Sequence, residues 1–172
     1  TRYNAPGARV MGLTLEGKMA YLTKFQVQAG VTLQQSHYSE PHVWNKEAPA
    51  VKKMMRTPNT YGYFTATYTP IKPLSIALSG TYTGSMLVPH EPVPGFLENP
   101  ITVNTKDFFD IGLKAAYDFK LYKSMNLQIN AGIQNIFNAY QNDFDKGADR
   151  DSGYIYGPSL PRSFFAGVKI SY

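Results

Sequence analysis

Three histidines are the first candidates for ligand chemistry in this sequence of 172 residues. His37, His42 and His90 lie in or beside two long polar segments that also carry several glutamates. Imidazole and carboxylate groups bind transition metals and haem iron. These histidines lack the close spacing of ligands on one helix or turn, and loop histidines are commonly just solvated. We therefore treat them as candidates for capturing a ligand, and we predict no resident cofactor.

An acidic segment near the end of the chain suggests a second chemistry, the binding of Ca²⁺ by carboxylate oxygens. Its acids are Asp143, Asp145, Asp149 and Asp151. The spacing departs from an EF-hand because Ala148, and not glycine, is the sixth residue counted from Asp143. Lys146 and Arg150 lie among the acids, so the sequence favours a loop braced by internal ion pairs over a calcium site.

A group of aromatic residues offers a third chemistry, the stacking of a flat ligand. Tyr38 and Trp44 belong to the first polar segment, and Tyr154 and Tyr156 follow the acidic one. A sugar or a macrocycle would suit such a surface, although loop aromatics also pack on one another for stability. Catalysis has little support, since the chain has no cysteine and no G-x-S-x-G motif. We predict that the protein is not an enzyme.

The charge balance gives no reason to expect a polyanionic partner. The chain carries 17 Lys and Arg against 12 Asp and Glu, a formal net charge of +5. Lys52, Lys53 and Arg56 form the only basic cluster, and it falls in a polar segment. A solvated loop explains this cluster better than a phosphate-binding surface does. We predict no nucleic-acid partner.

The elements that must position these residues are β-strands. In residues 125–134, MNLQINAGIQ, apolar residues such as Leu127 and Ile129 alternate with polar residues such as Gln128 and Asn130. A strand separates the two sets onto opposite faces, whereas a helix would mix them. The same pattern predicts seven strands, near residues 9–21, 25–37, 60–69, 74–86, 107–120, 125–136 and 162–172. Only the facing of 61–69 is ambiguous, because Tyr61 and Tyr63 at odd-numbered positions compete with Phe64 and Tyr68 at even-numbered positions for the apolar face.

The connections between the strands alternate between short and long. Short turns lie near residues 22–24, 70–73 and 121–124, while the other connections are long and polar. This alternation is typical of outer-membrane β-barrels and unusual in compact soluble domains. The aromatic residues gather near strand ends, and the polar face is rich in Gln, Asn, Ser, Thr and Gly. A soluble β-sandwich binding module is the weaker alternative, and a passive porin or small outer-membrane barrel is another.

Two stretches resemble a known family. NAGIQNIFNAYQ (130–141) and the closing RDSGYIYGPSLPRSFFAGVKISY are similar to the last strand pair of TonB-dependent receptors, especially those of Bacteroidetes-type bacteria. MMRTPNTYGYFTATYTP and GTYTGSMLVPH also resemble earlier strands of those barrels. The terminal strand resembles the assembly signal of outer-membrane proteins, with Phe164, Val168, Ile170 and Tyr172 at alternate positions.

The resemblance implies a multi-pass barrel wall in the Gram-negative outer membrane that serves energy-coupled import of a scarce nutrient, such as a metal–siderophore complex, haem or cobalamin. It also implies partners: a plug, the TonB complex, the barrel-assembly machinery and lipid, with a surface lipoprotein as a further candidate. Such barrels have about 22 strands, and closed bacterial barrels have an even number. Seven strands therefore predict a C-terminal segment, residues 1–172, whose missing plug and earlier strands lie elsewhere and whose first residues belong to an outer loop.

Overall fold

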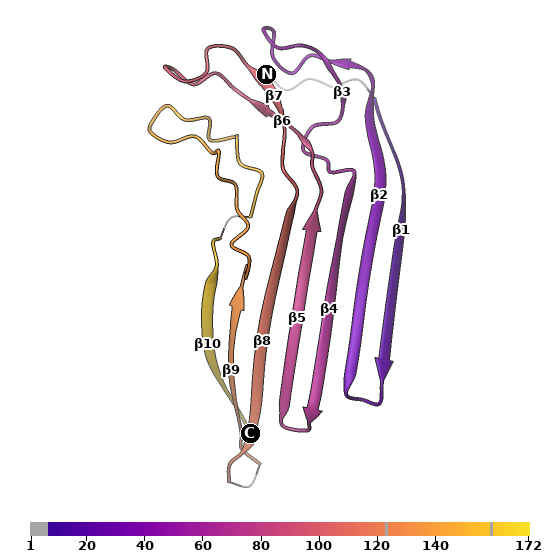
Figure 1. Ribbon diagram of the computed structural model, residues 1–172, viewed down its shortest axis with the longest axis vertical. Helices are drawn as coiled ribbons and strands as arrows, with labels where there is room; N and C mark the ends of the chain where they lie inside the picture. The colour runs from indigo at the N-terminus through magenta and orange to yellow at the C-terminus, as the bar shows by residue number, and fades with distance from the viewer. Residues whose placement is uncertain (1–6, 123, 159) are drawn as a thin grey trace.

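A computed structural model describes residues 7–122, 124–158 and 160–172, and one long antiparallel sheet is its main element (Figure 1). Seven long strands follow one another across this sheet in the order β1-β2-β4-β5-β8-β9-β10. Their bounds are β1 Ala8–Tyr21, β2 Phe25–His42, β4 Thr60–Ile71, β5 Leu74–Thr83, β8 Phe108–Lys120, β9 Asn126–Gln134 and β10 Ser163–Ser171. Each strand pairs with its neighbours in sequence, so the sheet is a meander. The described part of the chain contains no helix that is long and apolar enough to cross a membrane.

Each of the seven predicted spans corresponds to one of these long strands, but the described residues form ten strands in all. The three that the sequence did not predict are short: β3 Val51–Lys53, β6 Leu87–His90 and β7 Ile101–Asn104. They lie within the long connections, where β3 extends the main sheet beside β2 and β6 pairs with β7 as a separate hairpin. Strand β2 also runs five residues past its predicted end at His37, because β1 and β3 pair with its extension.

Long and short connections lie at opposite ends of the sheet, as predicted (Figure 1). We call the end with the tight turns the turn end and the other the loop end. At the turn end, the Tyr21 carbonyl accepts a hydrogen bond from the Lys24 N–H at 3.1 Å. Leu22 and Thr23, between them, have positive φ angles of 48° and 53°. Residues 1–6 of the expected outer segment 1–8, and Lys123 in the third turn, lie outside the described residues, and Ala8 of that segment already belongs to β1.

Strand register gathers most of the large apolar residues of the seven long strands on one face, with Phe108 and Phe165 among the exceptions. Leu15 pairs with Val31, and across the sheet Ile129 pairs with both Tyr117 and Val168. The polar residues line up on the other face in the same way; Gln128, for example, pairs with Lys169. Register also settles the facing of β4. Phe64 and Tyr68 lie on the apolar face, paired with Ala29 and Phe25, whereas Tyr61 and Tyr63 lie on the polar face, paired with Thr32 and Gly30.

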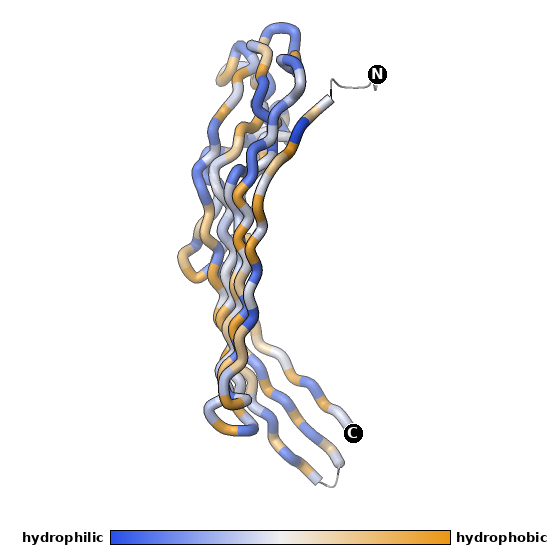
Figure 2. Tube along the Cα trace, turned by 90° about the vertical axis from the view of Figure 1, so that its right-hand side faces the viewer, coloured by the Kyte–Doolittle hydropathy of each residue, from blue (hydrophilic) through white to orange (hydrophobic). Residues whose placement is uncertain are grey.

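The sheet is a single curved layer, and nothing in the described chain covers its apolar face (Figure 2). Side chains of this face are exposed even on inner strands, Leu113 of β8 by 39% and Ile129 of β9 by 45%. A β-sandwich would bury them between two sheets, so the architecture differs from the sandwich alternative. The buried hydrophobic residues lie mainly near the loop end.

Aromatic rings lie over glycines of neighbouring strands and help to fix the register. A Cβ at Gly30 would stand 2.7 Å from the Tyr63 ring. The Phe64 ring covers Gly80 in the same way, and the Phe165 ring covers Gly132. A side chain at any of these positions would displace the ring, so the register depends on the glycines.

Aromatic residues also mark both ends of the apolar face. At the turn end Tyr21, Phe25 and Tyr68 stand side by side on three adjacent strands. Toward the loop end Phe109 is 6.4 Å from Phe64 and 6.5 Å from Phe137, measured between ring centroids. The predicted placement of aromatics near strand ends is thus present in the structure.

Candidate functional site

The long connections meet in a small core at the loop end. Met86, Val88 and Tyr154 are buried together, with Val103 and Tyr156 packed against them. Val88 has no exposed surface at all. These residues come from the β5–β8 and β9–β10 connections, which are distant in sequence. The site therefore starts as a hydrophobic contact between two loops.

His90 is the polar centre of this contact. Its Nε2 lies 2.9 Å from Oδ2 of Asp145, and the two side chains are only 6% and 4% exposed. The imidazole ring stacks on Tyr154 with 3.8 Å between centroids and an interplanar angle of 4°. The same Asp145 oxygen accepts a hydrogen bond from the backbone N–H of Asp151 at 3.1 Å. A buried carboxylate needs such partners, and here they hold two connections together.

Asp143 is held by two tyrosines beside this pair. The Tyr154 hydroxyl donates to one of its oxygens at 3.0 Å and the Tyr156 hydroxyl to the other at 2.6 Å. Burial favours the neutral acid, but the hydrogen bonds from Tyr156 and Tyr154 outweigh it, so the pKa of Asp143 lies below its ordinary value. Burial and the hydrogen bond to Asp143 raise the pKa of Tyr154 to about 12, and burial with the same carboxylate also raises the pKa of Tyr156.

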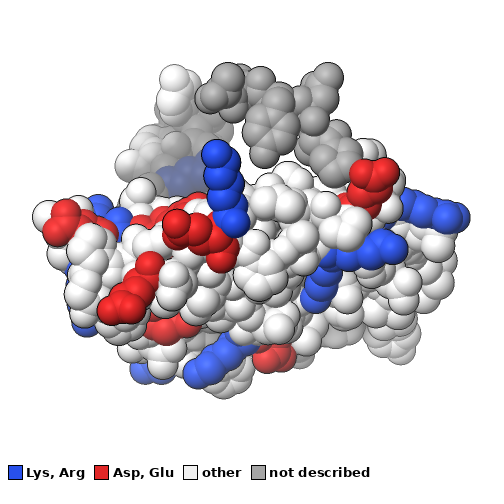
Figure 3. Space-filling view, turned by 90° about the horizontal axis from the view of Figure 1, so that it is seen from above, with Lys and Arg blue, Asp and Glu red and all other residues white. Residues whose placement is uncertain are grey.

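Further hydrogen bonds extend the contact to the β2–β4 connection. Arg56 donates to the backbone carbonyls of Gly153 and Ile155. Asn45 donates to Glu91 at 2.8 Å, and the Glu91 N–H donates to Asp151 at 2.9 Å. All three long connections are therefore joined into one cap. Seen from this end, most visible acidic side chains lie on the side of the β9–β10 connection (Figure 3).

The residues predicted to capture a ligand fall into two groups. His90, Tyr154 and Tyr156 come together, along with Asp143 and Asp145. His37 is exposed on β2, opposite Lys53, and the His42 ring lies 4.7 Å from Tyr38. Among the described residues no ring contact links Tyr38 or Trp44 to Tyr154 or Tyr156. The aromatic surface predicted from these four residues is thus divided between two places.

The acidic segment is not braced by the ion pairs that the sequence suggested. Arg150 donates to the carbonyl of Gly147, and the Lys146 ammonium lies 5.8 Å from the centre of the Phe144 ring. In the described chain the one contact between an acid of this segment and a basic side chain joins Asp145 to His90. The described residues also contain no group of three or more His, Asp or Glu placed to hold a metal. Calcium binding at Asp143, Asp145, Asp149 and Asp151 stays a prediction from the sequence.

Two important residues had no signal in the sequence. The sequence predicts a solvated basic cluster of Arg56 with Lys52 and Lys53, yet the Arg56 side chain anchors the β9–β10 connection. Gln141 is 6% exposed, donates to the Tyr154 carbonyl and accepts from the Tyr156 N–H. Both make bonds across long sequence separations that no local pattern reports.

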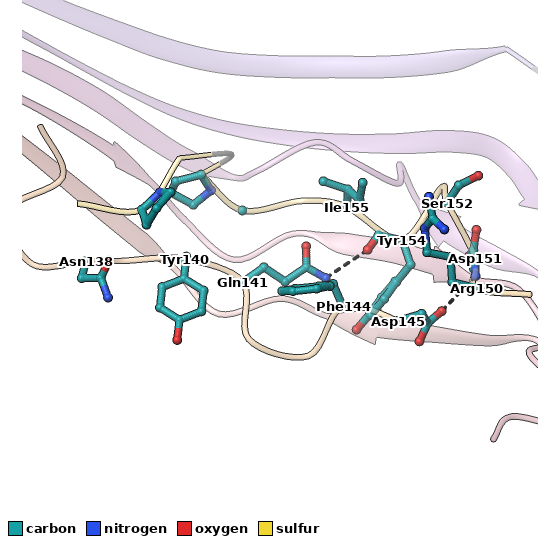
Figure 4. Close-up of a pocket in the computed structure, with 13 residues that line it drawn as sticks. Asn138, Tyr140, Gln141, Phe144, Asp145, Arg150, Asp151, Ser152, Tyr154 and Ile155 are labelled. Carbon is teal, nitrogen blue, oxygen red and sulfur yellow. Dashed lines mark hydrogen bonds between the residues drawn. The ribbon is translucent and has the colours of Figure 1, made fainter. Parts of the chain in front are cut away.

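Between the two legs of the β9–β10 connection lies an open cavity of about 640 Å³ (Figure 4). Figure 4 shows Tyr140 and Gln141 on one leg and Ile155 on the other. The lining residues all lie between Asn138 and Pro161, and they include Phe144, Arg150 and Asp151. At the base of the connection, Asn135 is 2% exposed and donates to the carbonyls of Ala139 and Leu160, which ties the two legs together.

The fold is similar to part of a solved transport receptor. The crystal structure of the ferric-catecholate import receptor Fiu from E. coli K12, in its closed form, matches with a TM-score of 0.65 and 21% identity. The match covers 94% of this chain and 20% of that one, so the chain spans about a fifth of that receptor's length. The sequence matches no protein-family model and no curated protein. The comparison shows a shared fold, with an import receptor and not an enzyme as the similar structure.

Proposed function

We propose that this chain forms part of the wall of an outer-membrane β-barrel receptor that imports a scarce nutrient by TonB-dependent, energy-coupled transport. The observation that carries the proposal is the single-layer sheet, with one continuous apolar face and one polar face. Apolar surface of this extent is unfavourable in water and favourable against lipid. The similar fold of an import receptor supports the same reading.

The strands have the length that the bilayer requires. A tilted strand crosses the hydrocarbon core with about 9–11 residues. The shortest of the seven long strands, β9 and β10, each have nine residues, and the longest, β2, has 18. The polar face would line an interior that holds water or a plug, where Gln128 and Asp118 can keep their hydrogen bond of 2.8 Å.

The open edges of the sheet support a larger barrel. Strands β1 and β10 each have one paired neighbour in the main sheet. In lipid, each unpaired backbone group would cost several kcal/mol. We propose that both edges pair with further strands of the same receptor, which enclose the plug that the TonB complex acts on. Expressed alone, this chain should aggregate. A closed, stable pore made by this chain alone would contradict the proposal.

Other proposed partners follow from biogenesis. Phe164, Val168, Ile170 and Tyr172 lie along one face of β10 and its end, and all are at least 60% exposed. We propose that this face is the signal recognised by the barrel-assembly machinery and later contacts lipid. The cap of long connections would face the outside, where it would contact ligand or a surface lipoprotein.

A cysteine scan tests the membrane facing, and the chain suits it because it has no native cysteine. Single cysteines at positions 127 to 134 of β9 would carry a nitroxide label in the complete receptor in lipid. We expect odd positions to be accessible to oxygen, which dissolves in lipid, and even positions to a water-soluble nickel chelate. An accessibility that does not alternate would exclude the proposed wall.

A passive porin is the second candidate, because a polar face can also line an open channel. Uptake in cells with and without TonB separates the two. Import that requires TonB supports the receptor, whereas unchanged uptake without it supports a porin.

A further inference from the structure

The first two tight turns at the turn end expose apolar side chains next to lysines. The turn between β1 and β2 contains Leu22 and Lys24, and the turn between β4 and β5 contains Lys72 directly after Ile71. Leu22 is 67% exposed and Ile71 is 53% exposed. Turns that lie in water are usually polar. The apolar residues therefore indicate that these two turns contact something other than bulk water.

The two turns are neighbours and are held at a fixed spacing. Strands β2 and β4 pair directly. The Thr69 N–H donates to the Lys24 carbonyl at 2.7 Å, which joins the first turn to the strand that leads into the second. Pro70 and Pro73 flank the second turn and restrict its backbone. Lys24 and Lys72 therefore belong to one firmly held edge of the sheet.

The charge around the tight turns is positive. The stretches of sequence centred on the three turns contain five lysines and a single acid, Asp118. These stretches are residues 17–28, 66–77 and 117–128. Asp118 accepts a hydrogen bond from Gln128 at 2.8 Å on the polar face of the sheet. Lys24 and Lys72 are exposed, and neither makes an ion pair within the described chain. The first two turns thus present positive charge that no acid of the described chain neutralises.

An aromatic row lies beside these turns on the apolar face. Tyr21, Phe25 and Tyr68 are paired side by side on β1, β2 and β4. Tyr21 is 65% exposed and Tyr68 is 48% exposed. Tyrosine favours the boundary between lipid and water, and a lysine near that boundary extends its ammonium toward the headgroups. The row continues the apolar face, so the partner that fits both the row and the lysines is a lipid with a negatively charged headgroup.

We propose that the first two turns bind an anionic phospholipid in the leaflet nearest the turn end, with its phosphate on Lys24 and Lys72 and its acyl chains against Tyr21, Phe25 and Tyr68. The proposal rests on the proposed barrel wall, because lipid reaches the turns only if the apolar face lies in a bilayer. To that wall it adds a preference for one class of lipid at one place. Phosphatidylglycerol fits, since its headgroup is negative, whereas phosphatidylcholine carries its own ammonium, which the lysines repel.

Fluorescence quenching in phosphatidylcholine vesicles measures which lipid is enriched at the site. The complete receptor would carry a single cysteine, labelled with bimane, in place of Met19, which lies on the apolar face of β1 and is 58% exposed. The vesicles would contain a small fraction of either phosphatidylglycerol or phosphatidylcholine with a nitroxide near the top of one acyl chain. We expect the phosphatidylglycerol quencher to act at about fivefold lower mole fraction, the effect of about one lysine close to an anionic headgroup.

A second label on the same strand and face supplies the control. Met11 lies toward the loop end of β1 and is 52% exposed. A bimane at this position should be quenched equally by the two lipids, because it is far from the tight turns. An equal preference for phosphatidylglycerol at positions 11 and 19 would mean a general attraction to a cationic receptor and would overturn the site.

Two double variants locate the lysines that act. Lys24→Gln with Lys72→Gln should remove the preference at position 19. Lys52→Gln with Lys106→Gln removes the same charge from exposed lysines at the loop end and should leave the preference unchanged. Inorganic phosphate should compete no better than sodium chloride at equal ionic strength, because it has no acyl chains to contact the aromatic row. A preference that survives in Lys24→Gln with Lys72→Gln, or that inorganic phosphate alone abolishes, would overturn the proposal.

The result can be separated from the test of the barrel wall. Alternating accessibility along β9 without any lipid preference at position 19 would overturn the lipid site and leave the wall intact. Accessibility along β9 that does not alternate would exclude the wall, and the lipid site with it.

Discussion

Two adjacent positions on β9 provide the sharpest test of the membrane reading. Ile129 and Asn130 are the fourth and fifth of the nine residues of this strand, so both lie near the middle of a crossing. Ile129 lies on the apolar face between Tyr117 and Val168. Asn130 lies on the polar face opposite Gly167, whose carbonyl accepts its amide at 3.1 Å. The two positions share depth and strand but differ in the face they occupy.

An arginine should be costly at the first position and tolerated at the second. At a lipid-facing position near the bilayer midplane, an arginine lowers the free energy of unfolding by about 2–4 kcal/mol. A loss of about 3 kcal/mol changes the folding equilibrium constant by about a hundredfold. Asn130→Arg loses one hydrogen bond, about 1 kcal/mol, and the small Gly167 opposite leaves room for the longer side chain.

Reversible urea unfolding of the complete receptor from lipid vesicles measures both costs. We expect Ile129→Arg to lower the free energy of unfolding by at least about 1 kcal/mol more than Asn130→Arg does. Equal losses would mean that the two faces meet the same environment. A larger loss for Asn130→Arg would mean that the faces are reversed, and either result would refute the reasoning from register to lipid exposure.

Three further predictions concern the turn, the glycines and the cap. Replacing Leu22 by Asn and Thr23 by Gly should stabilise the receptor by about 1–2 kcal/mol in the same unfolding assay, because both positions have positive φ. Gly132→Ala should destabilise it by about 1–3 kcal/mol, since a Cβ there meets a ring, whereas Gly17→Ala, with nothing within 4 Å, should be neutral. Tyr154 should ionise near pH 12 rather than 10. Because its pKa is higher in the folded state, its contribution to the stability of the receptor is complete below pH 10 and is lost as the pH rises to about 12. Difference absorbance of tyrosinate, with Tyr154→Phe as reference, measures this, and ionisation of Tyr154 near pH 10 would contradict it.

The long strands could be predicted from the sequence because alternation is a local property. Each span carries its own apolar and polar sets, so facing follows once strand register is known. The span around Tyr61 and Tyr63 shows the limit. Aromatic residues at both odd and even positions leave the facing of this span undecided in the sequence. The pairing of Tyr63 with Gly30 and of Tyr61 with Thr32 determines it. On the polar face Gly30 leaves space under the Tyr63 ring, whose hydroxyl donates to Glu16 and accepts from Gln28.

The short strands could not be predicted, because they depend on tertiary pairing. Strand β6 contains Pro89, which weakens any strand assignment from sequence, yet β7 lies opposite and completes the hairpin. The extension of β2 through Pro41 likewise depends on strand β3 beside it. In both cases the partner lies in a segment whose own pattern is that of a loop.

The same distinction between local and distant contacts explains why the cap was only half predicted. The chemistry of their side chains marks His90, Tyr154 and Tyr156 as candidates, but nothing local indicates that His90 meets an aspartate 55 residues away. Arg56 meets Gly153 and Ile155 across 97 and 99 residues. These polar bonds have little value unless the hydrophobic contact around Val88 has already brought the connections together, because an exposed pair of this kind contributes about 1 kcal/mol or less. Burial of the residues around Val88 brings the connections together, and the buried His90–Asp145 pair can then fix one arrangement of the loops.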